Sequence, residues 1–395
     1  MSRAYEVSHP WLTFTVHLDR APATLWLLLG EAQSKCDHIA GVPLRPRVAQ
    51  YLHQLYLVKG VQATTAIEGN TLTEQEVRDV LGGTLQVPQS KEYLAQEVRN
   101  IADACDSVVR RVTARQSATF TVEQIREFNR FVLRDLALPD HCRPGETRTY
   151  SVGVGTYRAA PAEDCDDLLG RLVEWLNGPT FRPPSRHLEI AYALIQAALA
   201  HLYLAWIHPF GDGNGRTARL MELQILMFAG ASSPAAHLLS NHYNQTRTEY
   251  YRQLERASAS GGDVVPFIEY AARGFVDGLR GQLDIIRAQQ QQVAWESYVH
   301  ERFDGTKSPA DIRRRHLVLD IAKGTEPVAS AQLRDVTPRV AANYARVSQR
   351  TFVRDVLKLQ RDGLVTIDSH GRVSANKSVI QAFLPIRRDH HVGSG

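Results

Sequence analysis

Apolar residues recur with the period of an α-helix along most of the first three quarters of the chain. In the segment 48–56, apolar and aromatic side chains occupy positions i, i+3, i+4, i+7 and i+8, which places them on one helical face. The same spacing predicts further helices near residues 92–112, 122–136, 164–176 and 188–206. The fold class that we expect is therefore mainly α.

One segment breaks the helical pattern. Residues 148–158 (RTYSVGVGTYR) are rich in β-branched and aromatic side chains with spaced glycines, which predicts a short strand or hairpin. A single hairpin in a helical protein is often a functional flap, and a plain connecting loop is an equally good interpretation of this pattern.

The chain changes character near residue 300. Residues 262–300 predict one or two long helices, and the polar stretch 302–309 predicts a linker. Beyond it the pattern indicates three helices, two short ones within 328–345 and a longer one over 348–361, and then two short strands. This part, residues 310–388, holds 15 Lys and Arg against 7 Asp and Glu, a net charge of +8 in a chain whose total is only +4. Basic charge is therefore concentrated in a separate C-terminal domain.

Length and composition exclude several classes of protein. A chain of 395 residues, 44% hydrophobic and 22% charged, is neither collagen, coiled coil nor disordered throughout. The longest apolar run, residues 194–207, is shorter than the roughly 20 residues of a membrane span and predicts a buried helix. The N-terminus lacks the apolar core of a signal peptide, so we expect a cytoplasmic protein with no membrane segment.

The cysteines carry no sign of a metal site or a disulfide framework. Cys36, Cys105, Cys142 and Cys165 lie far apart and form no Cys-x-x-Cys pair. We expect four reduced, unreactive thiols.

The most informative segment, residues 207–219, reads IHPFGDGNGRTAR and precedes an almost wholly apolar helix. Gly213, Asn214 and Gly215 stand where that helix begins, so their N–H groups form an anion site at the positive end of the helix dipole. Arg216 and Arg219 are three residues apart and offer bidentate contacts to further phosphate oxygens.

Two residues of this segment suit catalysis. Asp212 places a carboxylate beside the anion site, where Mg²⁺ is commonly held by one or two carboxylates together with substrate phosphates. His208 precedes Pro209, which we expect to keep it in an extended conformation, and a neutral imidazole there takes a proton from an incoming hydroxyl.

Residues 208–219 match every fixed position of the signature H-P-F-x-D/N-G-N-G-R-x-x-R, so the chain resembles the Fic (filamentation induced by cAMP) domain family. The resemblance implies an all-α core that transfers AMP from Mg-ATP to a Ser, Thr or Tyr hydroxyl of a protein. It implies that His208 is the general base and Asp212 the Mg²⁺ ligand. The residues that it implies bind ATP are Gly211, Asp212, Gly213, Asn214, Gly215, Arg216 and Arg219.

Other donors occur within the family. Transfer of UMP, phosphocholine or a phosphate uses the same motif with an altered orientation of the donor. Because this sequence keeps Asp212 and both arginines, we favour ATP.

Two further segments are similar to family features. Val152, Gly153, Val154 and Gly155 resemble the flap that precedes the signature, which implies a wall of the ATP site and an edge where a target segment docks as an added strand.

Downstream, Tyr250 and Tyr251 resemble a Tyr-Tyr pair whose first member contacts the adenosine. Two half-buried aromatic residues of a helix are the other interpretation. Some relatives have an Asn eight residues after the first tyrosine, where this chain has Ser258.

Near the N-terminus, residues 64–70 (TTAIEGN) fit the family's inhibitory pattern S/T-x-x-x-E-G/N, which assigns Thr64 and Glu68 to inhibition. A glutamate at a helix C-terminus faces the negative end of the dipole and favours a nearby cation. The resemblance implies that this cation is Arg219 and that the ion pair occupies the place of the γ-phosphate. The alternative is a surface helix end before a capping box formed by Thr73 and Glu76.

The C-terminal pattern resembles a winged helix-turn-helix. A helix over 348–361 opens with a serine cap, and residues 364–374 predict a strand, a turn and a strand. Such a domain binds either DNA or another protein, and the sequence favours neither interpretation. If the domain binds DNA, we expect the contacts to come from Arg350, Arg354, Lys358, Arg361 and Arg372.

These observations give four expected regions: an N-terminal helical region with the inhibitory helix (1–115), a Fic-type catalytic core with a hairpin flap (116–275), a helical connector (276–309) and a winged-helix-like domain (310–388). The expected function is a self-inhibited protein adenylyltransferase. The alternative is a DNA-binding regulator that uses the core as a nucleotide sensor. Expected partners are a target protein, the chain itself as a target, DNA and a second copy in a homodimer.

Overall fold

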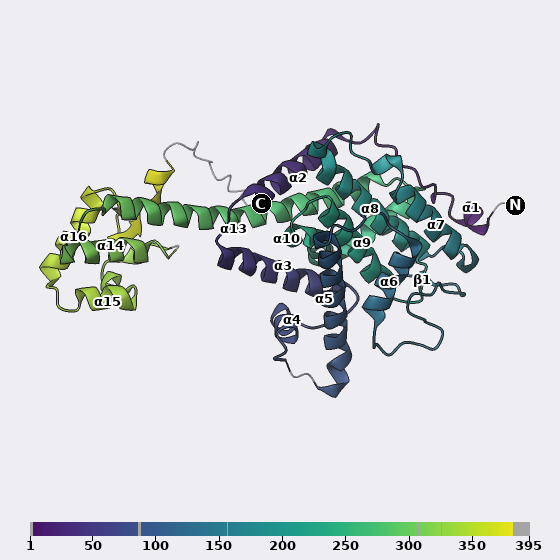
Figure 1. Cartoon of the computed structure of the whole chain (residues 1–395), viewed down its shortest axis with the longest axis horizontal. Coiled ribbons are helices and arrows are strands. Elements are labelled where there is room, and N and C mark those ends of the chain that lie inside the picture. The colour runs from purple at the N-terminus through teal and green to yellow at the C-terminus, as the bar shows by residue number, and fades with distance from the viewer. Residues whose placement is uncertain (1–2, 86–87, 156, 307, 325, 382–395) are drawn as a thin grey trace. The chain divides into compact units, whose positions relative to one another are not determined.

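We describe a computed structural model of the chain, which covers residues 3–85, 88–155, 157–306, 308–324 and 326–381 (Figure 1). The chain divides into two compact units, Met1–Leu283 and Asp284–Gly395. Each unit is described by itself. The fold is mainly helical, as the periodicity predicts.

The first unit begins with helices that surround the candidate inhibitory segment. Helix α3 packs against α5 and against the later helices α10 and α11. The capping box that the sequence predicts at Thr73 and Glu76 is confirmed at the start of α4. The helices of this part are α1 (Ala4–Ser8), α2 (Ala23–Gly41), α3 (Pro46–Ile67), α4 (Glu74–Leu81) and α5 (Glu92–Thr113), with a 3₁₀ turn at Gln89–Lys91.

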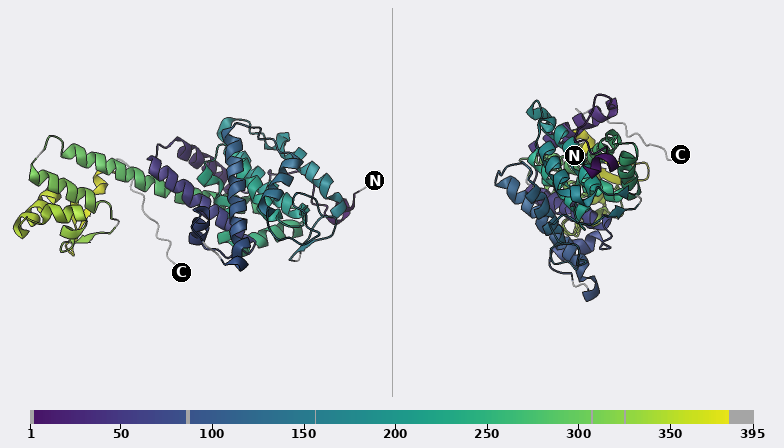
Figure 2. Two further views of the ribbon diagram at one scale, coloured as in Figure 1. Left: turned by 60° about the horizontal axis from the view of Figure 1, so that its bottom comes forward. Right: turned by 90° about the vertical axis from the view of Figure 1, so that its right-hand side faces the viewer.

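The core of this unit is the antiparallel pair α8 and α9, and Figure 2 shows the helices around it from two further sides. Helix α8 carries the longest apolar run and is buried almost throughout. Among the described residues one helix is long and apolar enough to cross a membrane, Arg186–Ile207, and 83% of its apolar window is buried inside the protein. The predicted core helix is therefore confirmed. The helices here are α6 (Val122–Leu133), α7 (Cys165–Leu176), α8 (Glu189–Ile207) and α9 (Asn214–Phe228).

A two-stranded hairpin lies between α6 and α7, where residues 148–158 predict one. Strands β1 (Gly153–Val154) and β2 (Tyr157–Arg158) pair antiparallel, with Gly153 opposite Arg158 and Val154 opposite Tyr157.

The unit closes with shorter helices and the start of a long one. Helix α13 runs unbroken through the segment for which the sequence predicts one or two long helices. All four cysteines are free, and their side chains are buried. The remaining elements are 3₁₀ turns at Ala162–Asp164, Pro179–Phe181 and Arg186–Leu188, and helices α10 (Ser233–Ala236), α11 (Leu238–Gln245), α12 (Arg247–Ala259) and α13 (Val265–Arg302).

The second unit contains helices and a three-stranded antiparallel sheet of order β3-β5-β4. The sequence predicts two short helices within 328–345 and only two strands. That prediction is wrong for residues 328–329, which form strand β3, because they pair with Val373 and Arg372 of β5. The elements are α14 (Pro309–Ile321), β3 (Val328–Ala329), a 3₁₀ turn at Leu333–Asp335, α15 (Pro338–Tyr344), α16 (Gln349–Arg361), β4 (Val365–Ile367), β5 (Arg372–Ala375) and a 3₁₀ turn at Lys377–Ile380.

Candidate active site

The signature residues form the loop that joins α8 to α9. His208 ends α8 with φ 48° and ψ 57°, so its backbone is left-handed and the expected extended conformation is wrong. Its N–H donates to the carbonyl of Leu204 at 2.8 Å, which closes the last helical turn. A non-glycine residue in this region is strained, and strain of this kind persists only where surrounding contacts impose it.

Arg148 supplies those contacts. Its guanidinium donates to the carbonyls of His208 (Nε, 2.8 Å) and Ile207 (3.4 Å), and its own N–H donates to the carbonyl of Pro209 at 2.9 Å. The side chain is only 4% exposed. Sequence reasoning missed this residue, because an arginine 60 positions before the signature carries no local signal.

The surroundings of His208 favour a neutral imidazole. Burial and the nearby charge of Arg148 lower the pKa of His208 to about 4, while Glu68 and Asp212 act in the opposite direction. An unprotonated imidazole at neutral pH is able to accept a proton.

Two asparagines fix the loop that follows. Asn214 accepts a hydrogen bond from the N–H of Phe210 and donates to its carbonyl, each at 2.9 Å. Asn129 of α6 donates to the carbonyl of Asp212 at 2.8 Å and accepts from the N–H of Gly145 at 2.8 Å. The side chain of Asn214 therefore shapes the loop, and Asn129, which sequence reasoning missed, ties the loop to α6.

The glycines are required by close packing. Gly213 has φ +76° and is the N-cap of α9, and no side chain among the described residues caps that helix. The first N–H groups of α9 therefore have no side-chain cap, which suits an anion. A side chain at Gly215 would overlap the carboxylate of Glu68, and one at Gly211 would meet Tyr150 and Cys142.

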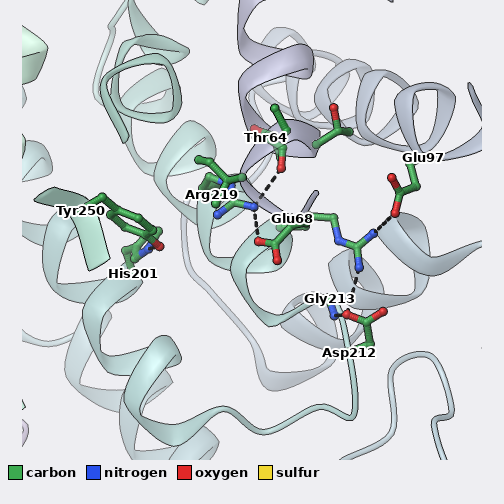
Figure 3. Close-up of polar contacts among 12 residues, drawn as sticks. Thr64, Glu68, Glu97, His201, Asp212, Gly213, Arg219 and Tyr250 are labelled. Atoms are coloured by element: carbon green, nitrogen blue, oxygen red, sulfur yellow. Dashed lines mark hydrogen bonds and ion pairs between the residues drawn. The ribbon is translucent and has the colours of Figure 1, made fainter. Parts of the chain in front are cut away.

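The second signature arginine is paired with the inhibitory segment (Figure 3). Nη2 of Arg219 donates to Oε1 of Glu68 at 2.6 Å and to the carbonyl of Thr64 at 3.0 Å. Burial opposes ionisation of Glu68, but the ion pair with Arg219 prevails and lowers the pKa of this carboxyl. Thr64 contributes its backbone oxygen to the contact.

Helix α12 holds the end of the inhibitory helix. Arg247 donates to the carbonyls of Ala66 (3.2 Å) and Ile67 (2.6 Å), and the hydroxyl of Tyr251 donates to Ile67 at 3.3 Å. These contacts satisfy the last carbonyls of α3 and place Glu68 beside them.

The first signature arginine is paired with a carboxylate that the sequence did not reveal. Arg216 donates to Oε1 of Glu97 in α5 at 2.9 Å and to Oδ1 of Asp212 at 3.0 Å (Figure 3). The other oxygen of Glu97 accepts from Asn70 at 2.8 Å. Asn70 lies two residues after Glu68, so one chain of hydrogen bonds joins the inhibitory segment to Asp212.

Both arginines keep buried donors without a partner in the described structure. These donors are Nε of Arg216 and Nε and Nη1 of Arg219. Buried guanidinium groups with spare donors fit the oxygens of a polyphosphate.

Asp212 fits a metal only as a single carboxylate. Its side chain is 47% exposed, and no cluster of three or more metal-binding side chains occurs within the described residues. That donor set suits Mg²⁺, which retains water and substrate-phosphate ligands, and does not suit a metal held by protein alone.

Tyr250 is buried beside His201, and Figure 3 shows the two side chains together. Its hydroxyl is 2.8 Å from Nε2 of His201, and its ring stacks on Tyr243 at 4.8 Å. The tyrosine is 3% exposed, so the expected adenosine contact stays a prediction. Ser258 donates to the carbonyl of Glu255 in its own helix.

The flap lies next to the end of α8. The N–H of Ala159 donates to the carbonyl of Val152 at 3.1 Å, and the hydroxyl of Tyr157 donates to the carbonyl of Trp206 at 2.9 Å. A contact of Val152, Gly153, Val154 or Gly155 with ATP stays a prediction.

In the second unit, the basic residues singled out by sequence are all exposed: Arg350, Arg354, Lys358, Arg361 and Arg372. Lys358 pairs with Asp362 and Arg372 with Asp368, each at 2.7 Å. Val353 and Leu357, on the same helix, are 45% and 44% exposed. Helix α16 therefore offers solvent a mixed basic and apolar surface.

Comparison with known proteins identifies the domain that carries this loop. Residues 119–226 match the family described as Fic/DOC family. This segment is a Fic domain. It contains the flap and the whole of the loop 208–219, so the resemblance seen in the sequence is confirmed.

Several curated proteins that resemble this chain are named as protein adenylyltransferases. The chain is 30% identical over 249 residues to "Protein adenylyltransferase Fic" of Nematostella vectensis, covering 62% of this chain and 53% of that protein. It is 32% identical over 216 residues to "Protein adenylyltransferase fic-1" of Caenorhabditis elegans, covering 54% and 38%. The chain thus spans about half the length, or less, of these relatives.

Solved structures share the fold of the Fic domain and its surroundings. Fic-1 (residues 134–508) from C. elegans aligns with a TM-score of 0.54 at 26% identity, over 67% of this chain and 73% of that one. A Fic family protein from Desulfovibrio desulfuricans aligns with a TM-score of 0.54 at 20% identity, over 90% and 96%. This second likeness concerns fold alone.

Proposed function

We propose that the chain transfers AMP from Mg-ATP to a hydroxyl of a protein. The observation that carries the proposal is a neutral His208 beside a helix N-terminus and two buried arginines with spare donors. The relatives named protein adenylyltransferase support it. The acceptor is a Ser, Thr or Tyr of a target protein, and the chain itself is one candidate target.

The chemistry follows from the positions of these groups. The acceptor oxygen forms a bond to the α-phosphorus while the bond from that phosphorus to the bridging oxygen breaks, and pyrophosphate leaves. His208 takes the hydroxyl proton. The N–H groups of α9 and the two arginines stabilise the charge on the phosphates. Asp212 would hold Mg²⁺, which neutralises phosphate charge when bound.

We further propose that Glu68 inhibits this transfer. Its carboxylate occupies Arg219 and lies against Gly215, where the phosphates would approach the backbone. Transfer needs Arg219 free to bind phosphate, so the ion pair must open first.

Intact mass spectrometry tests the activity without knowledge of the target. Glu68→Gly protein incubated with Mg-ATP should gain one AMP or transfer labelled AMP to lysate proteins, and Glu68→Gly/His208→Ala should do neither. ATP binding by the double variant should persist, because His208 does not hold the phosphates. Transfer in the absence of His208 would remove the histidine from the base role. Labelled UTP and phosphocholine donors serve as controls for donor identity.

We propose, second, that Asp284–Gly395 contains a winged helix-turn-helix that binds DNA. The order helix, strand, helix, helix, strand, strand and the three-stranded sheet support it. The exposed basic residues of α16 and Arg372 at the turn would contact phosphates, and Val353 and Leu357 would meet base edges. A regulator with the Fic domain as nucleotide sensor is the alternative whole-protein function. Cytoplasmic location and a homodimer remain part of the proposal.

Retention of a DNA duplex by the full chain tests this second proposal. Binding whose affinity falls steeply with salt would support DNA contact. If no duplex of mixed sequence binds at low salt, a protein partner replaces DNA in the proposal.

A further inference from the structure

Arg148 joins parts of the first unit that are distant in sequence. Its guanidinium donates to the carbonyls of Ile207 and His208 at the end of α8. It also donates to the backbone carbonyl of Tyr150 at 2.6 Å and to that of Ala160. Tyr150 precedes the flap and Ala160 follows it, so both arms of the flap root meet at this one side chain. All of these acceptors are backbone oxygens, which makes the contact independent of the neighbouring side chains.

The charge of Arg148 has no direct counter-ion. Among the described residues it forms no ion pair, although the side chain is 4% exposed. A buried, unpaired cation is costly, and carbonyl dipoles alone compensate it here.

We propose that Arg148 is a positioning residue for the transfer, whose guanidinium fixes the base His208 and the root of the flap in one register. The inference rests on the proposed function, in which the flap presents the acceptor segment and His208 removes its proton. A flap that shifts relative to His208 would misplace the hydroxyl, and a displacement of about 1 Å is enough to cost on the order of 100-fold in rate.

The positive charge adds a second effect on the same histidine. The charged groups that act on His208 are Arg148, which favours the neutral imidazole, and Glu68 and Asp212, which favour the protonated one. Removing the charge of Arg148 should therefore make His208 easier to protonate. Replacing the guanidinium with another cation removes its planar hydrogen-bonding geometry but keeps the charge, so the titration of His208 should stay unchanged.

Two substitutions separate geometry from charge. Arg148→Lys keeps the cation but cannot reach both arms of the flap root, and Arg148→Gln loses the cation as well. Both are made in the Glu68→Gly chain, with Arg143→Gln as a matched control, because Arg143 is 73% exposed and pairs only at the surface. The measurements are the rate of self-modification from pH 5 to 8, ATP affinity, urea unfolding, and the imidazole titration of His208 by NMR.

The expected result is a fall in transfer rate of about tenfold or more in both variants, with ATP affinity and the control unchanged. In Arg148→Gln alone, the pKa of His208 should move to a higher value. Wild-type rates in both variants would overturn the proposal. Loss of ATP affinity or of cooperative unfolding in both would also overturn it, because Arg148 would then be a general structural residue.

Failure of the proposed function gives a different result. If the parent Glu68→Gly chain transfers no AMP to itself or to lysate proteins, the transfer proposal fails, and the NMR titration still decides the effect of Arg148 on His208. Equal titration of His208 in all variants would then overturn the electrostatic link.

Discussion

Arginines occur in two opposite environments in this molecule. Arg216 and Arg219 are 3% and 2% exposed, and each pairs with a glutamate, Glu97 of α5 and Glu68 at the C-terminal end of α3. Arg350 and Arg354 on α16 are exposed to solvent. The first pair is held in one geometry by protein contacts, whereas the second is free to adapt to whatever anion approaches.

The difference shows how one residue type serves two kinds of anion recognition. A buried arginine is already desolvated, so it discriminates by shape and must first exchange one carboxylate for a phosphate. An exposed arginine remains hydrated and attracts a polyanion through counter-ion release, which is strongly screened by salt. A glutamate of the same chain can therefore regulate anion binding at the loop 208–219, whereas the exposed arginines of α16 have no such control.

The largest expected effect comes from removing the internal acid. Glu68→Gly should raise the rate of AMP transfer by about tenfold or more, because Arg219 becomes free for phosphate and the like charge near the phosphates is removed. Incorporation of labelled AMP measures it. Glu74→Gly, an exposed substitution at the start of α4 and six residues after Glu68, should leave the rate unchanged. An equal rate in wild type and Glu68→Gly would contradict the inhibitory role.

The exposed arginines should differ in their salt dependence. Arg350→Ala/Arg354→Ala should weaken duplex DNA binding by the full chain about tenfold and reduce the slope of log affinity against log salt by about 2. Arg273→Ala/Arg287→Ala removes the same charge from exposed positions on α13 and serves as control. If both pairs weaken binding equally, α16 is not the contact surface.

A smaller effect is expected at the second internal acid. Glu97→Gln removes a negative charge from the partner of Arg216 while keeping an oxygen that accepts a hydrogen bond. We expect ATP affinity to rise about threefold, since the phosphates no longer compete with a full charge. Isothermal titration measures the change, with Glu92→Gln, a surface pair on the same helix, as control. A lower affinity would show that Glu97 orients Arg216 for binding.

The smallest effect concerns pH. Burial lowers the pKa of both His208 and His237 to about 4, below the usual 6.5 of an unfolded histidine. As pH falls from 6.5 to 4, these histidines bind protons in the unfolded chain but stay unprotonated in the folded chain. The free energy of unfolding should therefore decrease over this pH range. Urea unfolding at pH 7, 6 and 5 measures the decrease. His237→Gln should make it smaller, and an unchanged decrease would exclude His237 as a source.

Sequence was most informative where function is local in the chain. The loop 208–219 could be predicted because a motif of fixed spacing carries it, whereas the pairing of Glu68 with Arg219, 151 positions apart, followed from the resemblance to the Fic family. Arg148, Glu97 and Asn129 could not, because the residues of the loop 208–219 that they contact lie 60 or more positions away in the chain.

Two errors have physical causes. Pro209 favours extended backbone in the residue before it, but the helix end and the contacts of Arg148 impose a left-handed conformation on His208. Strand β3 is only two residues long, so its pairing with β5 leaves too short a pattern to detect by alternation.

Arg247 and Tyr251 bind the last carbonyls of α3, and these contacts affect how fast Arg219 is released from Glu68. With the helix end tethered to α12, the quickest way to release Arg219 is rotation of the Glu68 side chain, which takes picoseconds to nanoseconds when unhindered. Withdrawal of the whole helix end breaks several hydrogen bonds together and belongs to the microsecond-to-millisecond range. We therefore expect Glu68 to leave Arg219 often and briefly. The fraction of molecules in this open state, and not the rate of opening, should then limit transfer.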